Sequence, residues 1–231
     1  MLSRKPGEIA SERRADAWVK ARIEELSHRK GLSLIDVGAG LSPYKSFIIS
    51  QGIDYFSHDF NSYLPSQNSF LGLQNHDWIY PKHDFECDIL EIPTIEKYDI
   101  VLCTEVLEHV PDPVATLKIL QSLMKPGGTL IITVPLLSLI HQAPYYFSSG
   151  LSVYWFEHWA HKLNFREVSI EVSGDYVDFM EQEILRLFGN LRIFRLVKLL
   201  TPNLKHLRKS IPPSLLSSAG FDTLVVLELN E

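Results

Sequence analysis

The sequence predicts an α/β protein whose core is a mostly parallel β-sheet, and three observations carry that prediction. Short apolar runs that end in an acidic residue or a glycine, such as residues 32–38, have the pattern of buried parallel strands. Segments with apolar residues at helical spacing separate most of these runs, and parallel strands require such crossovers. The last two runs, 165–173 and 222–230, are separated instead by a helical, basic stretch over 175–220, which we interpret as an insertion before the last strand.

The first four predicted elements are a helix, a strand, a second helix and a second strand, over residues 8–30, 32–38, 42–50 and 53–59. In the first helix apolar side chains recur every three or four residues, and Gly31 follows as a C-terminal cap. Pro43 suits the first turn of the second helix, where its missing amide proton is not needed. Residues 60–86 are polar, aromatic and aperiodic, so we expect an irregular segment there.

The rest of the chain continues the alternation. We expect the end of a strand at 87–90, a strand at 98–104, a helix at 110–124, a strand at 128–135, a helix at 149–163 and then the two final strands. Residues 125–128, Lys-Pro-Gly-Gly, are expected to end the preceding helix because proline and glycine do not continue one. The chain has no internal repeat, and its length predicts a single domain over 1–231.

Composition limits the class of protein. Hydrophobic residues make up 45% of the chain, as in ordinary globular proteins, and the formal net charge of −6 argues against a nucleic-acid binder that works through bulk positive charge. Two cysteines, Cys87 and Cys103, are too few for a disulfide framework. The N-terminal residues lack the apolar core of a signal peptide, and no apolar run reaches the roughly 20 residues of a spanning helix. We therefore expect a cytoplasmic protein.

The first predicted strand runs into a glycine turn, Asp36-Val37-Gly38-Ala39-Gly40. Glycine lets the backbone turn tightly and approach a ligand closely, and in an open parallel sheet this turn lies at the edge where ligands bind. A dinucleotide-binding G-x-G-x-x-G motif would need a glycine where Pro43 stands. A nicotinamide-dependent dehydrogenase is therefore disfavoured.

Two acidic residues stand where the neighbouring strands end. Asp59 follows Gly40 by 19 residues, a position from which a carboxylate accepts hydrogen bonds from both ribose hydroxyls of a nucleoside. Asp88 follows at the expected end of a third strand, where it could receive the amino group of an adenine ring. The alternative for each is an ordinary surface acid. The glycine turn favours the binding role for Asp59 and leaves the two roles of Asp88 evenly matched.

These features occur together with two longer motifs, EVLEHVPDP at 105–113 and LMKPGGTLIITVP at 123–135. In this order and spacing they resemble the class I S-adenosylmethionine-dependent methyltransferases, in particular the group that includes ubiquinone-pathway O-methyltransferases and sugar and polysaccharide methyltransferases. The resemblance covers residues 32–135 and is weaker over 136–231. It implies a Rossmann-like, seven-stranded sheet with an antiparallel last strand and helices on both faces. It also implies S-adenosylmethionine as cofactor and methyl transfer to an oxygen of a small molecule, sugar or lipid-linked glycan.

The resemblance also assigns roles to individual residues. Asp36, Gly38, Ala39 and Gly40 would hold the methionine portion of the cofactor, Asp59 its ribose, Asp88 and Ile89 its adenine, and Thr104 and Glu105 would line the floor near the sulfonium. Methyl transfer is a displacement, so proximity and in-line orientation supply much of the rate. Residues 54–112 hold twelve acidic residues against two lysines, and this negative charge complements the positive sulfonium.

Transfer to a hydroxyl also requires a proton acceptor, and histidine is the usual one near neutral pH. His109 is expected one helical turn from Glu105, and His141 lies in the loop after the strand 128–135, where acceptors enter. A structural role, with His109 bonded to Glu105 or to a backbone carbonyl, is favoured for that residue. His141 is therefore the better candidate for a catalytic base, with His109 as the second.

Glu105, Glu108 and His109 form an E-x-x-E-H pattern, for which a divalent ion has been suggested in ubiquinone O-methyltransferases. Glu108 and His109 are sequence neighbours, and neighbours on an α-helix point about 100° apart. Joint ligation of one ion by both side chains is then strained, and we expect no metal ion. The remaining histidines and cysteines have no regular ligand spacing.

The loop 141–150 departs from the family pattern, in which an acid and an arginine commonly follow the proline. Aromatic residues stand there instead, among them Tyr145 and Tyr146, which we expect to form pocket walls. This composition indicates an apolar or ring-stacking acceptor.

The predicted insertion carries a basic region. Residues 184–210 hold seven basic residues and no acidic one, and within 191–200 the apolar side chains share one helical face with bases opposite. Such segments bind anionic membranes or partner helices, or pack as a lid with the bases outward. We favour a cap over the acceptor pocket and leave open peripheral contact with the inner face of a membrane, a lipid-linked substrate or a phosphate-bearing one. The alternative function is a non-catalytic methyltransferase-like module that recruits a partner or a membrane through 184–210. The oligomeric state is not indicated.

Overall fold

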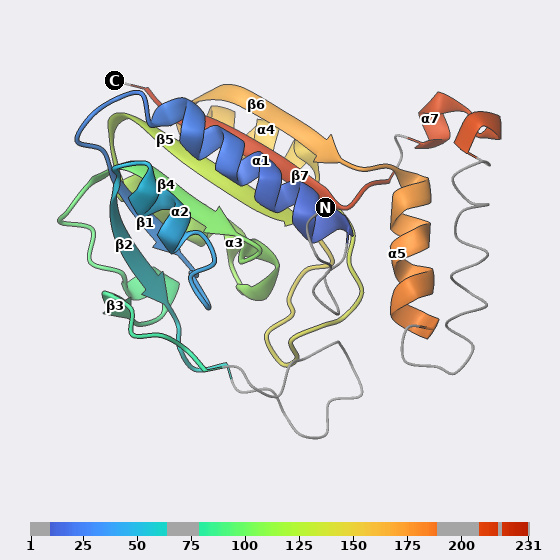
Figure 1. Cartoon of the computed structure of the whole chain (residues 1–231), viewed down its shortest axis with the longest axis horizontal. Helices are drawn as coiled ribbons and strands as arrows, with labels where there is room; N and C mark the ends of the chain where they lie inside the picture. The colour runs from blue at the N-terminus through green and yellow to red at the C-terminus, as the bar shows by residue number, and fades with distance from the viewer. Residues whose placement is uncertain (1–9, 64–78, 189–207, 217–218, 231) are drawn as a thin grey trace.

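The structure, a computed structural model, describes residues 10–63, 79–188, 208–216 and 219–230. Within these residues, seven strands form one sheet in the spatial order β3-β2-β1-β4-β5-β7-β6 (Figure 1). The strands are β1 Ser33–Val37, β2 Asp54–Asp59, β3 Phe85–Glu86, β4 Tyr98–Thr104, β5 Met124–Pro135, β6 Phe165–Ser173 and β7 Asp222–Leu229. The predicted α/β class and the seven-stranded sheet are confirmed.

The first five strands of the chain run parallel to one another, and the last one reverses direction. β1 lies between β2 and β4, and β4 pairs with β5, all in parallel. β7 enters between β5 and β6 and runs antiparallel to both, so that Val225 lies opposite Ile132 on one side and Ile170 on the other. The expectation of a Rossmann-like sheet with an antiparallel last strand is therefore confirmed.

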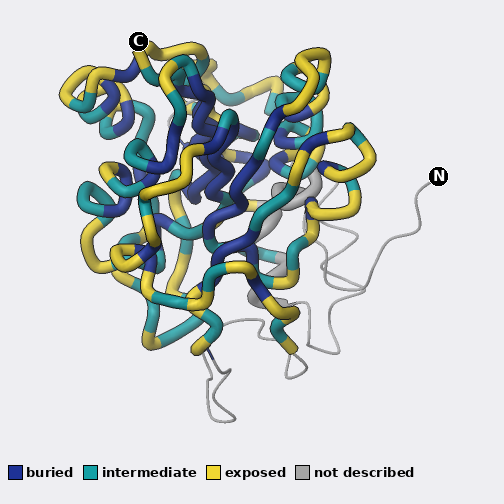
Figure 2. Tube along the Cα trace, turned by 90° about the vertical axis from the view of Figure 1, so that its left-hand side faces the viewer, coloured by how far each residue is buried: buried dark blue, intermediate teal, exposed yellow. Residues whose placement is uncertain are grey.

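Helices cover both faces of the sheet, and the side chains of β4 show why. Successive side chains of a strand point to opposite faces, and every residue from Ile100 to Cys103 is buried. Ile100 and Leu102 pack with α1 (Ala10–Leu26) and α2 (Lys45–Ser50), whereas Val101 and Cys103 pack with α3 (Pro113–Ser122) and α4 (Val153–Lys162). The central strands are buried on both sides as a result (Figure 2).

Three predicted boundaries are wrong around the Lys-Pro-Gly-Gly segment. The helix expected over 110–124 is the shorter α3, because Asp112 accepts hydrogen bonds from the amides of Val114 and Ala115 and Pro113 takes the first helical position. β5 begins at Met124, four residues before the expected strand, because Met124 already pairs with Tyr98. The Pro-Gly-Gly stretch is accommodated at a shift in register between Tyr98 and Ile100 instead of ending a helix.

Two smaller predictions are also wrong. Residues 87–90 do not end a strand: β3 is only Phe85–Glu86, and Asp88 caps a 3-10 helix, η1 (Ile89–Glu91), by accepting a hydrogen bond from the amide of Leu90. Pro43 lies outside α2, because Tyr44 is the residue that precedes its first turn.

Part of the predicted insertion is described. It contains α5 (Tyr176–Phe188), a 3-10 helix η3 (Arg208–Ser210) and α7 (Pro213–Leu216). The amphipathic stretch 191–200 and most of the basic region 184–210 lie outside the described residues. In the part that is described, Arg208 bonds to Asp175 and Asp178, and Arg14 of α1 bonds to Asp178 at 2.8 Å, so α5 is tied to the N-terminal helix. No helix among the described residues has the length and apolar character needed to cross a bilayer.

Candidate active site

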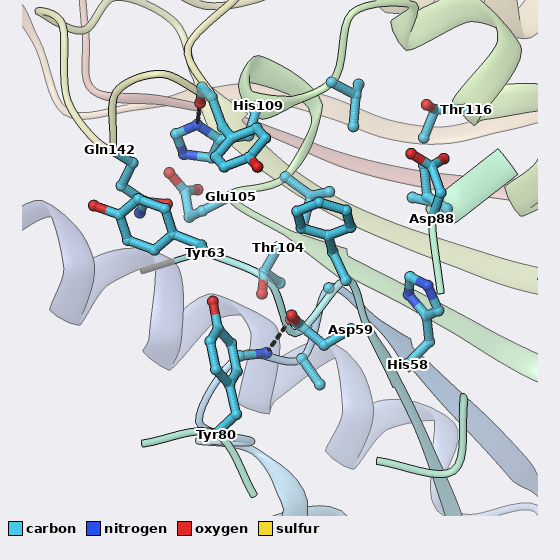
Figure 3. A pocket seen from close by; sticks show the side chains of 18 of the residues that line it. His58, Asp59, Tyr63, Tyr80, Asp88, Thr104, Glu105, His109, Thr116 and Gln142 are labelled. Carbon is cyan, nitrogen blue, oxygen red and sulfur yellow. Dashed lines mark hydrogen bonds between the residues drawn. The ribbon is translucent and has the colours of Figure 1, made fainter. Parts of the chain in front are cut away.

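A cavity of about 660 Å³ opens at the C-terminal ends of the parallel strands. The turn after β1, the end of β2, the 3-10 helix η1 and the end of β4 all contribute to its wall. Figure 3 shows Asp59, Asp88, Thr104 and Glu105 around the same space. The cavity therefore lies at the edge where ligands bind in open α/β sheets.

The glycine turn after β1 is held against the end of β2. The amides of Gly38 and Ala39 both donate to the carbonyl oxygen of His58, each at 2.9 Å. Gly38 has a φ of +77°, and a Cβ atom there would lie 2.3 Å from Cγ2 of Val106. Both the backbone conformation and the close approach of Val106 therefore require glycine at position 38.

Asp59 is oriented by backbone donors on both sides. Its Oδ2 accepts a hydrogen bond from the amide of Gly40, and its Oδ1 accepts one from the amide of Asn61, each at 2.8 Å. Each carboxylate oxygen can accept a further hydrogen bond. Asp59 lines the cavity, so its carboxylate can receive a pair of ligand hydroxyls without first being reoriented.

Asp88 and Ile89 lie on the cavity wall next to the end of β2, whereas Asp36 does not reach the wall. Asp36 is 1% exposed beneath the glycine turn, where the hydroxyl of Tyr55 donates to its Oδ2 at 3.0 Å. Burial raises the pKa of Asp36 to about 7. Asp36 therefore lies behind the cavity wall in this structure, and its contact with the methionine portion of a cofactor stays a prediction.

Thr104, the last residue of β4, and Glu105, which follows it, lie at the floor of the cavity. Glu105 has a φ of +55°, an uncommon conformation for a residue with a side chain. Its amide donates to the carbonyl oxygen of Thr133, and the hydroxyl of Thr133 donates to its carboxylate at 2.7 Å. These two bonds hold an unfavourable backbone conformation, which is common at functional sites.

The rest of the wall is aromatic and acidic. Phe60, Tyr63 and Tyr145 form a ring cluster, with centroids 5.4 Å apart for Phe60 and Tyr145 and 6.2 Å apart for Tyr63 and Tyr145. Tyr146, expected as a second wall, instead donates its hydroxyl to the carbonyl oxygen of Ser138. Five carboxylates line the cavity, and no lysine or arginine does so among the described residues. The cavity is therefore suited to a cationic or neutral ligand with planar rings.

His109 lines the cavity but is not on an α-helix with Glu105. The left-handed conformation of Glu105 prevents a continuous helix through this segment, and Leu107–His109 forms a separate 3-10 helix, η2. The expected placement one helical turn from Glu105 is wrong for that reason. His109 donates its Nδ1–H to the carbonyl oxygen of Tyr145, and its buried Nε2 lies 3.5 Å from Oε1 of Glu108. Burial lowers the pKa of His109 to about 4.

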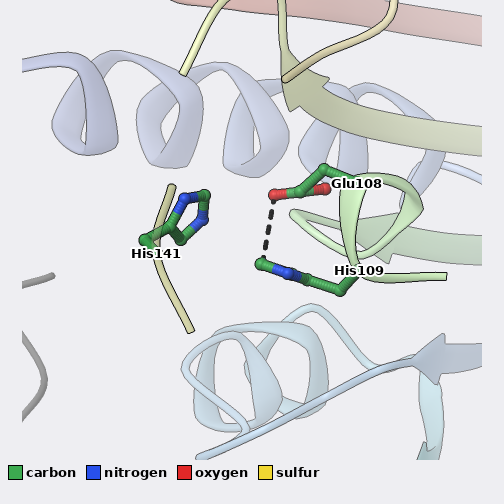
Figure 4. A group of neighbouring side chains, drawn as sticks. All are labelled: Glu108, His109 and His141. Atoms are coloured by element: carbon green, nitrogen blue, oxygen red, sulfur yellow. Dashed lines mark ion pairs between the residues drawn. The ribbon is translucent and has the colours of Figure 1, made fainter. Parts of the chain in front are cut away.

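His141 lies beside His109 but is not part of the cavity wall. The two ring centroids are 4.8 Å apart, and His141 donates its Nδ1–H to the carbonyl oxygen of Leu139 at 2.9 Å. The fully buried Glu108 lies close to both rings (Figure 4). Burial and the nearby carboxylate of Glu105 raise the pKa of Glu108 well above its ordinary range.

Comparison with known proteins identifies the family of this chain. The sequence profile described as "Methyltransferase domain" matches residues 10–181. The chain belongs to the class I S-adenosylmethionine-dependent methyltransferases. A ubiquinone biosynthesis O-methyltransferase of Coxiella burnetii is 31% identical over 114 residues, which are 48% of this chain and 47% of that protein. The chain thus spans about half the length of the curated relatives it matches.

Solved structures share the fold of this chain. One is an S-adenosylmethionine-dependent methyltransferase of Archaeoglobus fulgidus, with a TM-score of 0.56 and 18% identity over 92% of this chain and 93% of that one. Another is a phosphoethanolamine N-methyltransferase of Haemonchus contortus, in complex with S-adenosylhomocysteine, with a TM-score of 0.51 and 16% identity over 92% of this chain and 52% of that one. The family assignment replaces the dehydrogenase alternative.

Some residues of the cavity wall were not foreseen from the sequence. Asp16 reaches the cavity from α1, where the hydroxyl of Tyr44 donates to its Oδ1 at 2.6 Å. Asp16 lies among other charged residues of a helix, so no local pattern distinguishes it. Tyr63 and Tyr80 come from the segment expected to be irregular, where their aromatic character was the available signal.

Proposed function

We propose that this protein transfers the methyl group of S-adenosylmethionine to an oxygen atom of a small molecule, a sugar or a lipid-linked glycan. The observation that carries the proposal is the pair formed by the glycine turn and Asp59, because it offers a close backbone approach beside an oriented carboxylate. The similarity to ubiquinone biosynthesis O-methyltransferases supports oxygen as the acceptor atom. The aromatic part of the wall supports an acceptor with a planar ring.

Different residues around the cavity would bind different portions of the cofactor. Asp59 would bind the ribose hydroxyls, and Asp88 with Ile89 would frame the adenine. The backbone of Gly38, Ala39 and Gly40 would hold the methionine portion together with Asp36, which precedes the turn in β1. These placements follow the order of the residues along the sheet edge.

The floor and the acidic wall suit a cationic methyl donor. When bound, S-adenosylmethionine supplies an electrophilic methyl group attached to a positively charged sulfur. Thr104 and Glu105 lie where they can face that charge, and the other wall carboxylates add to the negative potential. The aromatic rings would hold the acceptor so that its oxygen is in line with the carbon–sulfur bond. Proximity and orientation then supply most of the rate.

The fate of the acceptor proton decides how much a base contributes. His141 and His109 remain the proposed candidates, but His109 has a low pKa and a buried Nε2, and His141 lies outside the cavity wall. An acceptor whose hydroxyl ionises readily needs little help from either. Once an acceptor is known, His141→Ala distinguishes the two cases: loss of a general base lowers kcat by about 100-fold or more, whereas kcat falls by less than about tenfold if the acceptor ionises readily by itself.

The experiment that tests the function has two steps. Binding of S-adenosylhomocysteine to the purified chain is measured by calorimetry, with Gly38→Arg and Asp59→Ala expected to abolish it. The chain is then incubated with isotope-labelled S-adenosylmethionine and host metabolite and glycan extracts, and products heavier by one labelled methyl group are sought by mass spectrometry. Absence of cofactor binding by the wild-type chain would refute the proposal.

The second candidate is a non-catalytic module that recruits a partner or an anionic membrane through residues 184–210. The seven basic residues of that region support it, although Arg208 is already engaged by Asp175 and Asp178. Cofactor binding without any methylated product, together with sedimentation on anionic vesicles, would favour this candidate. Placement in the cytoplasm, with peripheral contact at the inner face of the membrane, belongs to the same proposal.

A further inference from the structure

The N-terminal helix α1 contributes one carboxylate to the cavity. Asp16 lies on the wall together with the glycine turn, Gly38 to Gly40, and with Tyr44, which follows that turn. This is the end of the cavity where the methionine portion of the cofactor would lie. We propose that Asp16 binds the α-ammonium group of that methionine portion, an inference that rests on the proposed function and deepens it.

Contacts on either side of Asp16 fix the helix that carries it. α1 packs across one face of the sheet (Figure 1). Two residues before Asp16, Arg14 bonds to Asp178 of α5 at 2.8 Å. Two residues after it, Trp18 donates its Nε1–H to Glu171 of β6 at 2.7 Å. Asp16 is therefore presented to the cavity from a helix that is anchored near its own position.

Tyr44 orients the carboxylate of Asp16. Its hydroxyl donates to Oδ1 of Asp16 at 2.6 Å. Burial of Tyr44 and this hydrogen bond both raise the pKa of the Tyr44 hydroxyl, so it stays protonated and remains a donor. Carboxylate oxygens together can accept several hydrogen bonds. The contact with Tyr44 therefore positions Asp16 and leaves it able to accept further bonds from an ammonium group.

The amides of the glycine turn are already engaged. Those of Gly38 and Ala39 donate to the carbonyl oxygen of His58, and that of Gly40 donates to Asp59. No lysine or arginine among the described residues lines the cavity. This end of the cavity is thus richer in acceptors than in donors, and it suits a cationic group. The methionine portion of S-adenosylmethionine carries such a group, its α-ammonium.

Asp16 is placed differently from Asp36, the other acid expected near the methionine portion. Asp16 lines the cavity, whereas Asp36 lies behind its wall. Hydrogen bonds between a carboxylate and an ammonium group are about twice as strong as those between neutral groups. Asp16 would therefore add a direct charged contact to the one predicted for Asp36, and the contact would come from a helix outside the sheet.

The test compares two ligands on the full chain by calorimetry. They are S-adenosylhomocysteine and its deamino analogue, which lacks only the α-ammonium group. Asp16→Asn keeps an acceptor for Tyr44 and removes the charge, so it should weaken binding of S-adenosylhomocysteine by about tenfold or more. The deamino analogue carries only a negative charge, so its affinity should stay unchanged or increase. Asp16→Ala should show the same selectivity between the two ligands.

Glu24→Gln is the matched control, because it removes an exposed acid from the same helix. It should leave the affinity for both ligands unchanged, and far-UV circular dichroism shows that each variant is folded. Equal losses for the two ligands would overturn the proposal, since a structural effect on the cavity does not depend on the ammonium group. Wild-type binding that both Asp16 variants leave intact would refute this inference alone. Absence of binding to the wild-type chain would refute the proposed function and the inference with it.

Discussion

The backbone amide of Gly40 donates a 2.8 Å hydrogen bond to Oδ2 of Asp59. This bond joins two sequence features that lie 19 residues apart, the glycine turn after β1 and the acid that ends β2. The carbonyl oxygen of His58 accepts two further amides of the same turn. The C-terminal ends of β1 and β2 are therefore linked by hydrogen bonds. A substitution at Asp59 should alter the glycine turn, and a substitution in the turn should alter the orientation of Asp59.

Replacing Asp59 by asparagine tests this link directly. The substitution removes the negative charge and turns one acceptor oxygen into a donor, so either the Gly40 or the Asn61 amide loses its partner. Hydrogen bonds to charged groups contribute about 1.5–3 kcal/mol, so the affinity for S-adenosylhomocysteine should fall by roughly ten- to 100-fold. Calorimetry measures the change. Asp54→Asn, an exposed acid at the other end of β2, is the control and should bind as the wild type does.

Alanine substitutions at Gly38 and Gly52 test why glycine is required at position 38. Both have positive φ values, +77° and +75°, but a Cβ atom at Gly38 would meet Val106 at 2.3 Å, whereas nothing lies within 4 Å of one at Gly52. Gly52→Ala should lower the free energy of unfolding by about 1–2 kcal/mol through backbone strain alone. Gly38→Ala should cost about 1–3 kcal/mol more from overpacking. Urea denaturation gives both values, and equal losses would show that Val106 moves aside freely.

The sequence was most informative where one local pattern determines the structure. The strands over 98–104 and 165–173 were predicted to the residue. The first is a buried apolar run, and such a run has few alternatives. The glycine turn and Asp59 were also recognisable, because glycine at a strand end and an acid at the next strand end are local features. Their convergence then follows from the parallel order of the strands.

Features that depend on tertiary pairing were not predictable in the same way. The Pro-Gly-Gly stretch continues a strand because Met124 pairs with Tyr98, a contact that composition does not reveal. Asp16 reaches the cavity only because α1 packs across the sheet. The approach of His141 to Glu108 and His109 depends on the path of a loop. The separation of His141 from Glu108 and His109 along the sequence matches no common spacing of metal ligands.

The ion pairs of Asp178 hold α5 to α1 through Arg14 and to η3 through Arg208, and their loss should be measurable. Burial of Asp178 opposes its ionisation, but hydrogen bonds from Arg14 and Arg208 outweigh burial and hold the pKa of Asp178 below its usual value. Asp178→Asn should lower the free energy of unfolding by about 1–3 kcal/mol at pH 7, since both arginines are partly exposed.

The difference between the wild type and Asp178→Asn should shrink as the pH falls through the pKa of Asp178 in the folded state, because the wild type then loses the same charge. Arg166→Met breaks the exposed pair of Arg166 with Glu228 and serves as control. It should cause no measurable change in urea denaturation. A loss as large as that of Asp178→Asn would contradict the structural role given to the α1–α5 contact.

Asp36 should impose the opposite pH dependence on stability. Burial, together with the nearby charge of Asp59, raises its pKa to about 7, although the hydrogen bond from Tyr55 opposes this. Between about pH 4 and pH 7 the folded state then holds a proton that the unfolded state has released, so the free energy of unfolding decreases as the pH rises across this window. The decrease is at most about 4 kcal/mol, at 1.36 kcal/mol per pKa unit.

Asp36→Asn keeps an acceptor for the Tyr55 hydroxyl and cannot titrate. The free energy of unfolding of this variant, measured by urea denaturation without cofactor, should therefore rise relative to that of the wild type as the pH increases from 4 to 7 and stay constant above. Other carboxylates titrate in both proteins, so their contributions cancel in the difference. A difference that does not change with pH would mean that Asp36 ionises as freely in the folded chain as in the unfolded one. The glycine turn would then have to accommodate a buried charge beside Asp59.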